Sequence, residues 1–248
     1  MPFPRLSSRT DTALPGAVVE LRQYTLHPGR RDALVALFER EFIETQEACG
    51  LHVLGQFRDL DRADRFVWLR GFTDMGARRH GLHAFYGGPV WAAHREAANA
   101  TMIDSDDVRL LRPAWPGAGV VVRAADRAPR GTTSNPPGAV GVMVWPLDPP
   151  ADAPPIGRCR EALVAALRAS GASATGVYAT EPAANDFPRL PVREGEPVLV
   201  ALAVFPGVAA LDAWPHALRG LHASLRAWRA GAPETLRLAP TPRSALHA

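Results

Sequence analysis

The sequence predicts an α+β protein in which two repeats with the element order βαββαβ face each other as one barrel. The same succession of alternating and helical apolar patterns occurs twice, on either side of a stretch dense in proline and glycine at residues 113–138. A four-stranded sheet of this kind carries its helices on one face only, so the other face must be buried by something else. A second copy in the same chain would supply that cover.

The first half is expected to hold four strands and three helices. Apolar residues that alternate along the chain predict strands, and apolar residues spaced by three or four predict helices. Gly50 would end the first helix, and Pro89 suits the first turn of the last helix, where its missing N–H costs nothing. The expected strands are residues 17–26, 51–58, 66–72 and 108–111, and the expected helices are residues 31–48, 74–84 and 89–101.

The second half repeats this scheme. Its expected strands are residues 139–147, 173–180, 197–205 and 235–238, and its expected helices are residues 156–169 and 208–230. The whole chain therefore predicts two tandem ferredoxin-like repeats that form a pseudo-dimeric α/β barrel. We place the first domain at residues 17–114, a linker at 115–137 with a strand-like piece at 120–123, and the second domain at 138–240. Residues 1–16 and 240–248 are expected to be loose ends.

The composition excludes several classes of function. All 28 basic residues are arginine and the formal net charge is only +3, so Schiff-base chemistry and the lysine of a phosphate-binding loop are ruled out. The arginines are scattered among acids, and we therefore expect no nucleic-acid partner. No apolar run approaches the ~20 residues of a membrane span, and the start lacks the apolar core of a signal peptide. We expect a cytoplasmic protein with no membrane partner.

Metal and cofactor motifs are missing from the sequence. Cys49 and Cys159 are isolated and far apart, which is typical of free thiols rather than of a disulfide or a zinc site. The eight histidines form no HxxxH or HExxH pair, so a metal site would need ligands brought together by the fold. We expect no cofactor. An axial haem ligand at His216 or His222 is the lesser alternative.

Three stretches of the first half carry a family resemblance: ELRQYTLHPGRRDALVALFE (20–39), GQFRDLDRADRFVWLRGF (55–72) and AFYGGPVWAAHREAANATMIDSDDVRLLRPA (84–114). They resemble the NIPSNAP family of the dimeric α/β-barrel superfamily, and residues 185–200 resemble the second halves of bacterial tandem members. The resemblance implies a barrel fold. Relatives in that superfamily include cofactor-free monooxygenases, polyketide cyclases, isomerases and haem-handling proteins, and a shared fold transfers none of these activities.

The first strand places Glu20, Arg22 and Tyr24 on one face. In a barrel both faces of the sheet are covered, so Glu20 and Arg22 would need partners, most simply each other or a bound anion. An internal ion pair is the structural interpretation of this pattern. A ligand contact is the functional one.

The helix that starts at Pro89 presents Trp91, His94, Ala98 and Met102 on one face. An ordinary packing helix explains most of this pattern, but a histidine and an arginine beside an apolar face need partners. In the functional interpretation His94 acts as base or hydrogen-bond donor, and Arg95 or Arg22 stabilises an enolate or phenolate.

The candidate residues of the site follow from these patterns. The loop 181–197 is long for a hairpin connection and would either close over a pocket or pack on the outside. We expect catalytic roles for His94, Arg95 and Tyr86, and substrate contacts from Arg22, Tyr24, Trp68, Trp91, Asn99, Phe187 and Arg193.

Two classes of function remain open. The first is a small-molecule-binding protein, in particular a cofactor-independent enzyme of the cyclase, isomerase, dehydratase or monooxygenase type that acts on a hydrophobic or aromatic metabolite. The second is a non-catalytic oligomeric scaffold or stress-related interaction protein. A homodimer is compatible with either, because the repeat would leave sheet edges available for pairing.

Overall fold

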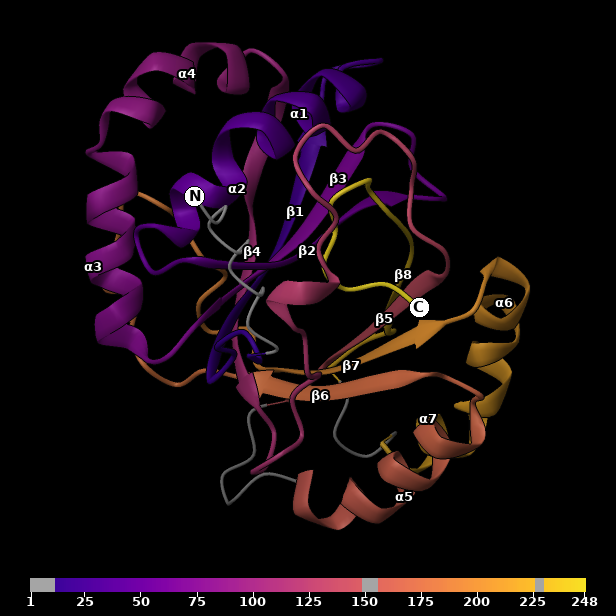
Figure 1. Ribbon diagram of the computed structural model, residues 1–248. Coiled ribbons are helices and arrows are strands. Elements are labelled where there is room, and N and C mark those ends of the chain that lie inside the picture. The colour runs from indigo at the N-terminus through magenta and orange to yellow at the C-terminus, as the bar shows by residue number, and fades with distance from the viewer. Residues whose placement is uncertain (1–11, 149–155, 226–229) are drawn as a thin grey trace, which may run out of the picture.

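The computed structural model describes residues 12–148, 156–225 and 230–248 and shows a single closed barrel of eight strands (Figure 1). The strands are β1 (Val18–Leu26), β2 (His52–Asp59), β3 (Arg65–Phe72), β4 (Met102–Pro113), β5 (Ala139–Pro146), β6 (Ala174–Thr180), β7 (Val198–Phe205) and β8 (Glu234–Pro240). The helices are α1 (Arg31–Leu37), η1 (Phe38–Phe42), α2 (Ile43–Glu47), α3 (Met75–Tyr86), α4 (Pro89–Asn99), η2 (Ala124–Asp126), α5 (Ile156–Ala169), α6 (Val208–Ala217) and α7 (Arg219–Ser224).

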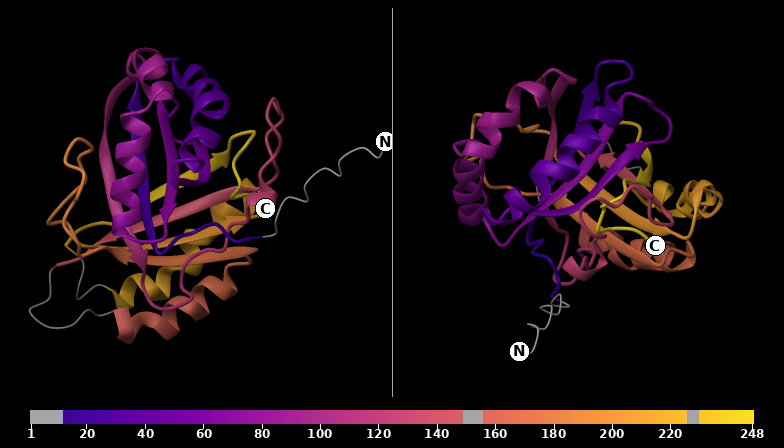
Figure 2. Two further views of the ribbon diagram at one scale, coloured as in Figure 1. Left: turned by 60° about the vertical axis from the view of Figure 1, so that its left-hand side comes forward. Right: turned by 45° about the horizontal axis from the view of Figure 1, so that its top comes forward.

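The strand order confirms the predicted tandem barrel. Each half contributes four antiparallel strands, in the orders β4-β1-β3-β2 and β8-β5-β7-β6, and the pairs β2·β8 and β4·β6 join the two sheets. Helices α1 to α4 cover the outside of the first half, and α5 to α7 cover the outside of the second half (Figure 2). Because all eight strands are paired on both sides, a homodimer would have to use a surface other than a strand edge of the barrel.

The alternation of β1 sorts its side chains into two layers. Val19 and Leu21 enter the barrel interior, which valines and leucines from both halves fill, so the barrel centre is a packed core. Tyr24 and Leu26 point outward to the apolar layer beneath α1 to α4. Any site built from the outward residues of β1 therefore lies between sheet and helices.

The predicted helix 31–48 contains a wide turn. It begins as α1, passes through the π-helical turn η1 and ends as α2. Leu34, Phe38, Phe42 and Gln46 are spaced by four residues, and such a row drifts by about 40° per step around a helix of 3.6 residues per turn. The wider turn offsets this drift and keeps the row directed at the sheet.

The prediction of a loose C-terminal end is wrong. Residues 241–246 are buried, and Ala245 and Leu246 pack into the barrel interior. The Thr241 N–H donates to the carbonyl of Gln56 at 3.0 Å, and the Arg243 N–H donates to Glu39 at 2.9 Å. The prediction failed because the polar composition of the tail is typical of an exposed end, whereas the tail closes one end of the barrel.

Two further expectations need correction. Residues 120–123 form no strand, and the structure shows only an isolated bridge between Arg123 and Ala13, beside a hydrogen bond from Leu14 N–H to the carbonyl of Val122. The expected helix 208–230 is divided into α6 and α7 near Leu218, while residues 226–229 lie outside the described part. In the described ranges no helix is both long and apolar enough to cross a bilayer.

A buried ion cluster lies on the outward face of the first-half sheet. The Glu20 carboxylate accepts from Arg22 at 3.0 Å, from Arg70 at 2.6 and 3.0 Å, and from Arg78 at 2.8 Å. All four side chains are 0 to 1% exposed. The predicted burial and mutual pairing of Glu20 and Arg22 are confirmed, and Arg70 joins them because it stands opposite Glu20 on β3.

The same cluster holds Glu20 ionised. Burial alone would raise the pKa of Glu20, but the charges of Arg70, Arg22 and Arg78 outweigh burial and hold the pKa well below its ordinary value of 4.5. A carboxyl whose pKa is lowered by folding stabilises the folded state fully above its unfolded pKa. This contribution declines as the pH falls from there through the folded pKa.

Replacing Leu246 by Ala tests whether the tail belongs to the core. We expect the free energy of unfolding in urea to fall by about 2–5 kcal/mol, because a buried leucine leaves a cavity when truncated. Val121→Ala serves as control, since Val121 is 61% exposed and its truncation should change stability by less than about 0.5 kcal/mol. Equal effects of the two substitutions would contradict the packing of the tail.

Replacing Glu20 by Gln should lower the free energy of unfolding by about 3–5 kcal/mol at pH 7, because three guanidinium groups lose their buried partner. Urea unfolding of the unmodified protein at decreasing pH should show stability that declines below about pH 4.5, because Glu20 takes up a proton in the unfolded chain while the folded protein still holds it ionised. The Glu20→Gln variant should lack this share of the decline. Asp106→Asn, at an exposed position, is the control. An identical pH profile for Glu20→Gln and the unmodified protein would refute this role of Glu20.

Candidate functional site

A small cavity lies between the first-half sheet and the helices that cover it. Its volume is about 30 Å³. Four of the predicted substrate-contacting or catalytic residues line it, namely Tyr24, Trp68, Tyr86 and Trp91. The other lining residues are Leu34, Phe38, Phe42, Gln46, Phe85, Ala98 and Met102.

Aromatic rings form most of the cavity wall, and they meet edge to face. The ring centroids of Tyr24 and Trp68 lie 6.0 Å apart at 83°, those of Phe38 and Trp68 lie 4.9 Å apart at 69°, and those of Tyr86 and Trp91 lie 4.9 Å apart at 77°. Such pairs fix one another's orientation and present ring faces or edges to a planar guest. Strands β1 and β3 supply the floor, and η1, α3 and α4 supply the walls.

Arg22 brings positive charge to this aromatic wall. Its Nε donates to the Tyr24 hydroxyl at 3.0 Å, and its guanidinium carbon lies 5.5 Å from the ring centroids of both Tyr24 and Trp68. Arg22 and Trp68 are also cross-strand partners in the register of β1 and β3. Burial raises the pKa of the Tyr24 phenol, so Tyr24 is neutral and Arg22 remains a cation beside it.

Two buried donors in this region have no acceptor among the described residues. They are the indole N–H of Trp68 and one terminal nitrogen, Nη2, of Arg78. Buried donors are usually satisfied, so unpaired ones favour an acceptor that comes from a ligand or from water. Both lie in the layer that also holds the cavity.

The cavity is too small for a metabolite in this arrangement. A volume of about 30 Å³ accommodates water, because one water molecule needs a cavity of roughly 10–15 Å³. Ligand pockets typically measure about 300–1,000 Å³. A metabolite would therefore enter only if part of the wall moved.

The structure separates the predicted residues of α4. Trp91 lines the cavity, whereas His94 is 31% exposed and its Nε2 lies 3.7 Å from the Glu41 carboxylate. Arg95 and Asn99 are exposed. The expectation that Arg95 and Asn99 face an enclosed pocket is therefore wrong, because the helix turns both side chains to solvent, and His94 stands outside the cavity beside Phe42.

The loop 181–197 reaches from the second half to the first. Phe187 is 2% exposed and stacks on Tyr86, with ring centroids 6.0 Å apart at 30°, so it closes over the aromatic wall. Arg193 does not reach the cavity. Its side chain pairs with Asp107 at 3.3 Å and with Glu196 at 2.7 Å.

Sequence reasoning missed Arg70, Arg78 and Asp186. Arg70 was accessible in principle, because pairing of the predicted strands 17–26 and 66–72 places an arginine opposite Glu20. Arg78 lies on a predicted helix without any local pattern that marks it as buried. Asp186 comes from the other half of the chain and binds Arg78 at 2.6 Å, a contact that no sequence spacing signals.

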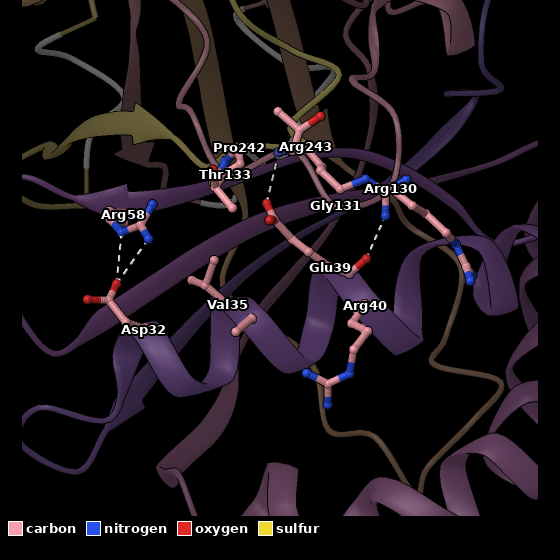
Figure 3. A pocket seen from close by; sticks show the side chains of 12 residues that line it. Asp32, Val35, Glu39, Arg40, Arg58, Arg130, Gly131, Thr133, Pro242 and Arg243 are labelled. Carbon is pink, nitrogen blue, oxygen red and sulfur yellow. Dashed lines mark hydrogen bonds and ion pairs between the residues drawn. The ribbon is translucent and has the colours of Figure 1, made fainter.

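A larger groove lies elsewhere on the first half (Figure 3). It measures about 370 Å³ and runs between α1, η1, residues 130–133 and the C-terminal tail. Its charged groups are already paired: Arg58 binds Asp32 at 3.0 Å, the Glu39 carboxylate accepts from the backbone N–H of Arg243 at 2.9 Å, and the Arg243 guanidinium binds Glu44. The groove depends on the linker and the tail, and none of the predicted site residues lines it.

The two histidines considered as axial haem ligands are His216 and His222. His216 is exposed on α6, and the side chain of His222 is outside the described residues. In the described ranges no three His, Cys, Asp or Glu side chains gather at a spacing suited to a metal ion.

Comparison with solved structures places the whole chain in one fold. A candidate monooxygenase from Lactobacillus acidophilus NCFM is 11% identical, with 92% of this chain and 96% of that chain covered and a TM-score of 0.56. A candidate monooxygenase from Fusobacterium nucleatum is 8% identical, with 93% and 96% covered and a TM-score of 0.59. An anthrone oxidase-like protein is 13% identical, with 93% and 95% covered and a TM-score of 0.53.

At these identities the likeness establishes the fold alone. No curated protein matches the sequence. The NIPSNAP family model matches residues 19–115, which span β1 to β4 and every first-half residue that lines the cavity. Residues 19–115 are therefore similar to the NIPSNAP family, and this match covers less than half of the chain.

Proposed function

We propose that the protein binds a small planar molecule with an acidic hydroxyl, a phenol or an enol, and holds it as its anion in the aromatic cavity beside Arg22. The observation that carries this proposal is the excess of positive charge in the buried cluster. Arg22, Arg70 and Arg78 face Glu20 and the partly exposed Asp186, so one positive charge is left over. An anionic ligand would neutralise it.

The cavity wall suits an aromatic or conjugated ligand. Trp68, Trp91 and the two tyrosines offer flat apolar surface with few polar groups, which is the usual make-up of a small-molecule site. The free indole N–H of Trp68 offers a hydrogen bond to a ligand oxygen. These features favour a hydrophobic or aromatic metabolite over a sugar or a nucleotide.

The same arrangement supports catalysis without a cofactor. A buried guanidinium beside the cavity stabilises negative charge as it develops on an oxygen, so Arg22 would lower the pKa of a bound enol or phenol. Reactions that proceed through the substrate's own enolate, such as cyclisation, isomerisation, dehydration or substrate-activated oxygenation, are compatible with this chemistry. The likeness to candidate monooxygenases and to an anthrone oxidase-like protein supports this group of reactions at the level of the fold.

One observation favours a non-catalytic scaffold instead. The cavity measures only about 30 Å³. A core residue such as Phe38 would pack equally well in a protein that binds no ligand. The scaffold function predicts no binding of phenols. A direct binding measurement therefore separates the two functions.

We expect 4-nitrophenol to bind the unmodified protein with its phenolate form favoured, so that the apparent pKa of the bound probe, read from absorbance, is lower than in water. Arg22→Gln should weaken binding of the phenolate by about tenfold to a hundredfold, because a hydrogen bond to a charged group contributes roughly 1.5–3 kcal/mol. This variant should still fold, since Arg70 and Arg78 remain to balance Glu20 and Asp186.

Arg79→Gln provides the matched control, because Arg79 is the exposed neighbour of Arg78 on α3. It should bind the probe as the unmodified protein does. Absence of binding to the unmodified protein, or equal binding by Arg22→Gln and Arg79→Gln, would rule out the proposed site and leave the scaffold function.

A further inference from the structure

Residues 185–187 of the second half lie against α3 of the first half and fill a place beside the cavity. In Figure 2 the segment between β6 and β7, coloured orange, reaches the first half, where it contacts α3. It contributes Asn185, Asp186 and Phe187 to the layer beneath the first-half helices. The contacts divide into a polar part at Arg78 and an aromatic part at Tyr86.

The polar part is a carboxylate held by a buried guanidinium. The Arg78 side chain is 0% exposed, and its Nη1 donates to Asp186 at 2.6 Å and to the Asn185 side chain at 3.1 Å. Its Nε donates to Glu20 at 2.8 Å, while its Nη2 has no partner among the described residues. Arg78 thus keeps an unused donor directly beside the carboxylate that it already binds.

The aromatic part is a phenyl ring between two rings of α3. Phe187 stacks on Tyr86 with centroids 6.0 Å apart at 30°, and His83 meets the phenyl ring edge to face at 4.8 Å and 84°. Tyr86 also lines the cavity, so its ring separates the cavity from Phe187. Asp186 and Phe187 therefore present a carboxylate and a phenyl ring to a cation and an aromatic surface.

We propose that Asp186 and Phe187 occupy a binding site for an aromatic carboxylate, and that such a ligand takes their place when the segment 181–197 lifts. The carboxylate of the ligand binds Arg78 in place of Asp186 and can also use the free Nη2. Its ring takes the place of Phe187 on Tyr86. This site adjoins the cavity of the proposed function, because the Tyr86 ring contacts Phe187 and also lines the cavity.

The segment keeps its shape through bonds of its own. It contains no helix or strand between Thr180 and Val198, and Asn185 bonds within it to the carbonyl of Leu190 at 2.9 Å. A hollow of about 440 Å³ lies between its two legs, over Leu110. Two groups of contacts hold the segment to the first half: Asn185, Asp186 and Phe187 bind Arg78 and Tyr86, and Arg193 binds Asp107 at 3.3 Å and the Val108 carbonyl at 2.8 Å. The proposed exchange releases the first group.

Charge balance makes the exchange selective for anions. When Asp186 leaves Arg78, three guanidinium groups share the single carboxylate of Glu20 in a space closed to water. A ligand carboxylate restores the balance, whereas a neutral amide of the same shape does not. Opening should therefore be favoured by carboxylates and not by uncharged aromatic molecules.

Calorimetric titration with 4-phenylbutanoate and with the neutral 4-phenylbutanamide tests the proposal. The Asp186→Asn variant and the double variant Asp186→Ser/Phe187→Ser should bind 4-phenylbutanoate at least about tenfold more tightly than the unmodified protein does, because the internal competitor has been removed. The amide should bind the variants at least about tenfold more weakly than the acid. Arg78→Gln, added to the double variant, should abolish binding of the acid.

Glu196→Gln is the matched control, since it removes one carboxylate from the same segment at a 49% exposed position remote from Arg78. It should bind like the unmodified protein. Equal affinity of the double variant and the unmodified protein for 4-phenylbutanoate, or equal binding of acid and amide by the double variant, would overturn the proposal. If Arg78→Gln fails to fold, the comparison of the acid with the amide still tests the proposal.

The two proposals can fail separately. Binding of 4-nitrophenol in the cavity depends on Arg22, whereas binding of 4-phenylbutanoate depends on Arg78 and Asp186.

Discussion

The Glu20 carboxylate meets three guanidinium groups in a layer closed to water, and this imbalance shapes the first half of the molecule. A buried cation without a counter-charge is costly, so each arginine needs further contacts. Arg70 also binds the Gln46 amide oxygen at 2.9 Å, Arg22 donates to Tyr24, and Arg78 extends to Asp186 on the other half. Arg22 connects this cluster to the cavity wall, and Arg78 connects it to the loop that covers that wall.

The two halves share a topology but not a chemistry. Among the described residues from 139 to 238, no charged side chain is buried. The outward residues of β5 are apolar, and a Cβ on Gly141 would lie 2.4 Å from the Trp214 ring, so α6 packs directly on the strand. The second half thus fills the space that the first half leaves for a cluster and a cavity, and its contribution to the site is the loop.

The sequence predicted those features of the fold that depend on local residue patterns. Alternation placed Glu20, Arg22 and Tyr24 on one face of β1, and the repeated element order implied a barrel that would bury them. Contacts between distant segments were beyond its reach. The tail at 241–246 has a polar composition although it closes the barrel, and Asp186 reaches Arg78 across the two halves. Helical spacing grouped Arg95 with Trp91, but it could not decide how far the covered face of α4 extends.

Fusion of two repeats in one chain explains why a single loop can serve the site. When two identical repeats assemble, both have the same sequence. Each repeat must then carry the residues that stabilise the cavity and also the residues that cover it. Here the barrel closes within one chain through the strand pairs β2·β8 and β4·β6. One half can therefore carry the residues that stabilise the cavity, and the other half the residues that cover it. The first half retains the ionic cluster, while the second half, with an apolar outer layer, extends the segment between β6 and β7 across the junction to Arg78 and Tyr86. Covalent linkage therefore permits the asymmetry of charge between the halves, because each half has its own sequence while both build one interior.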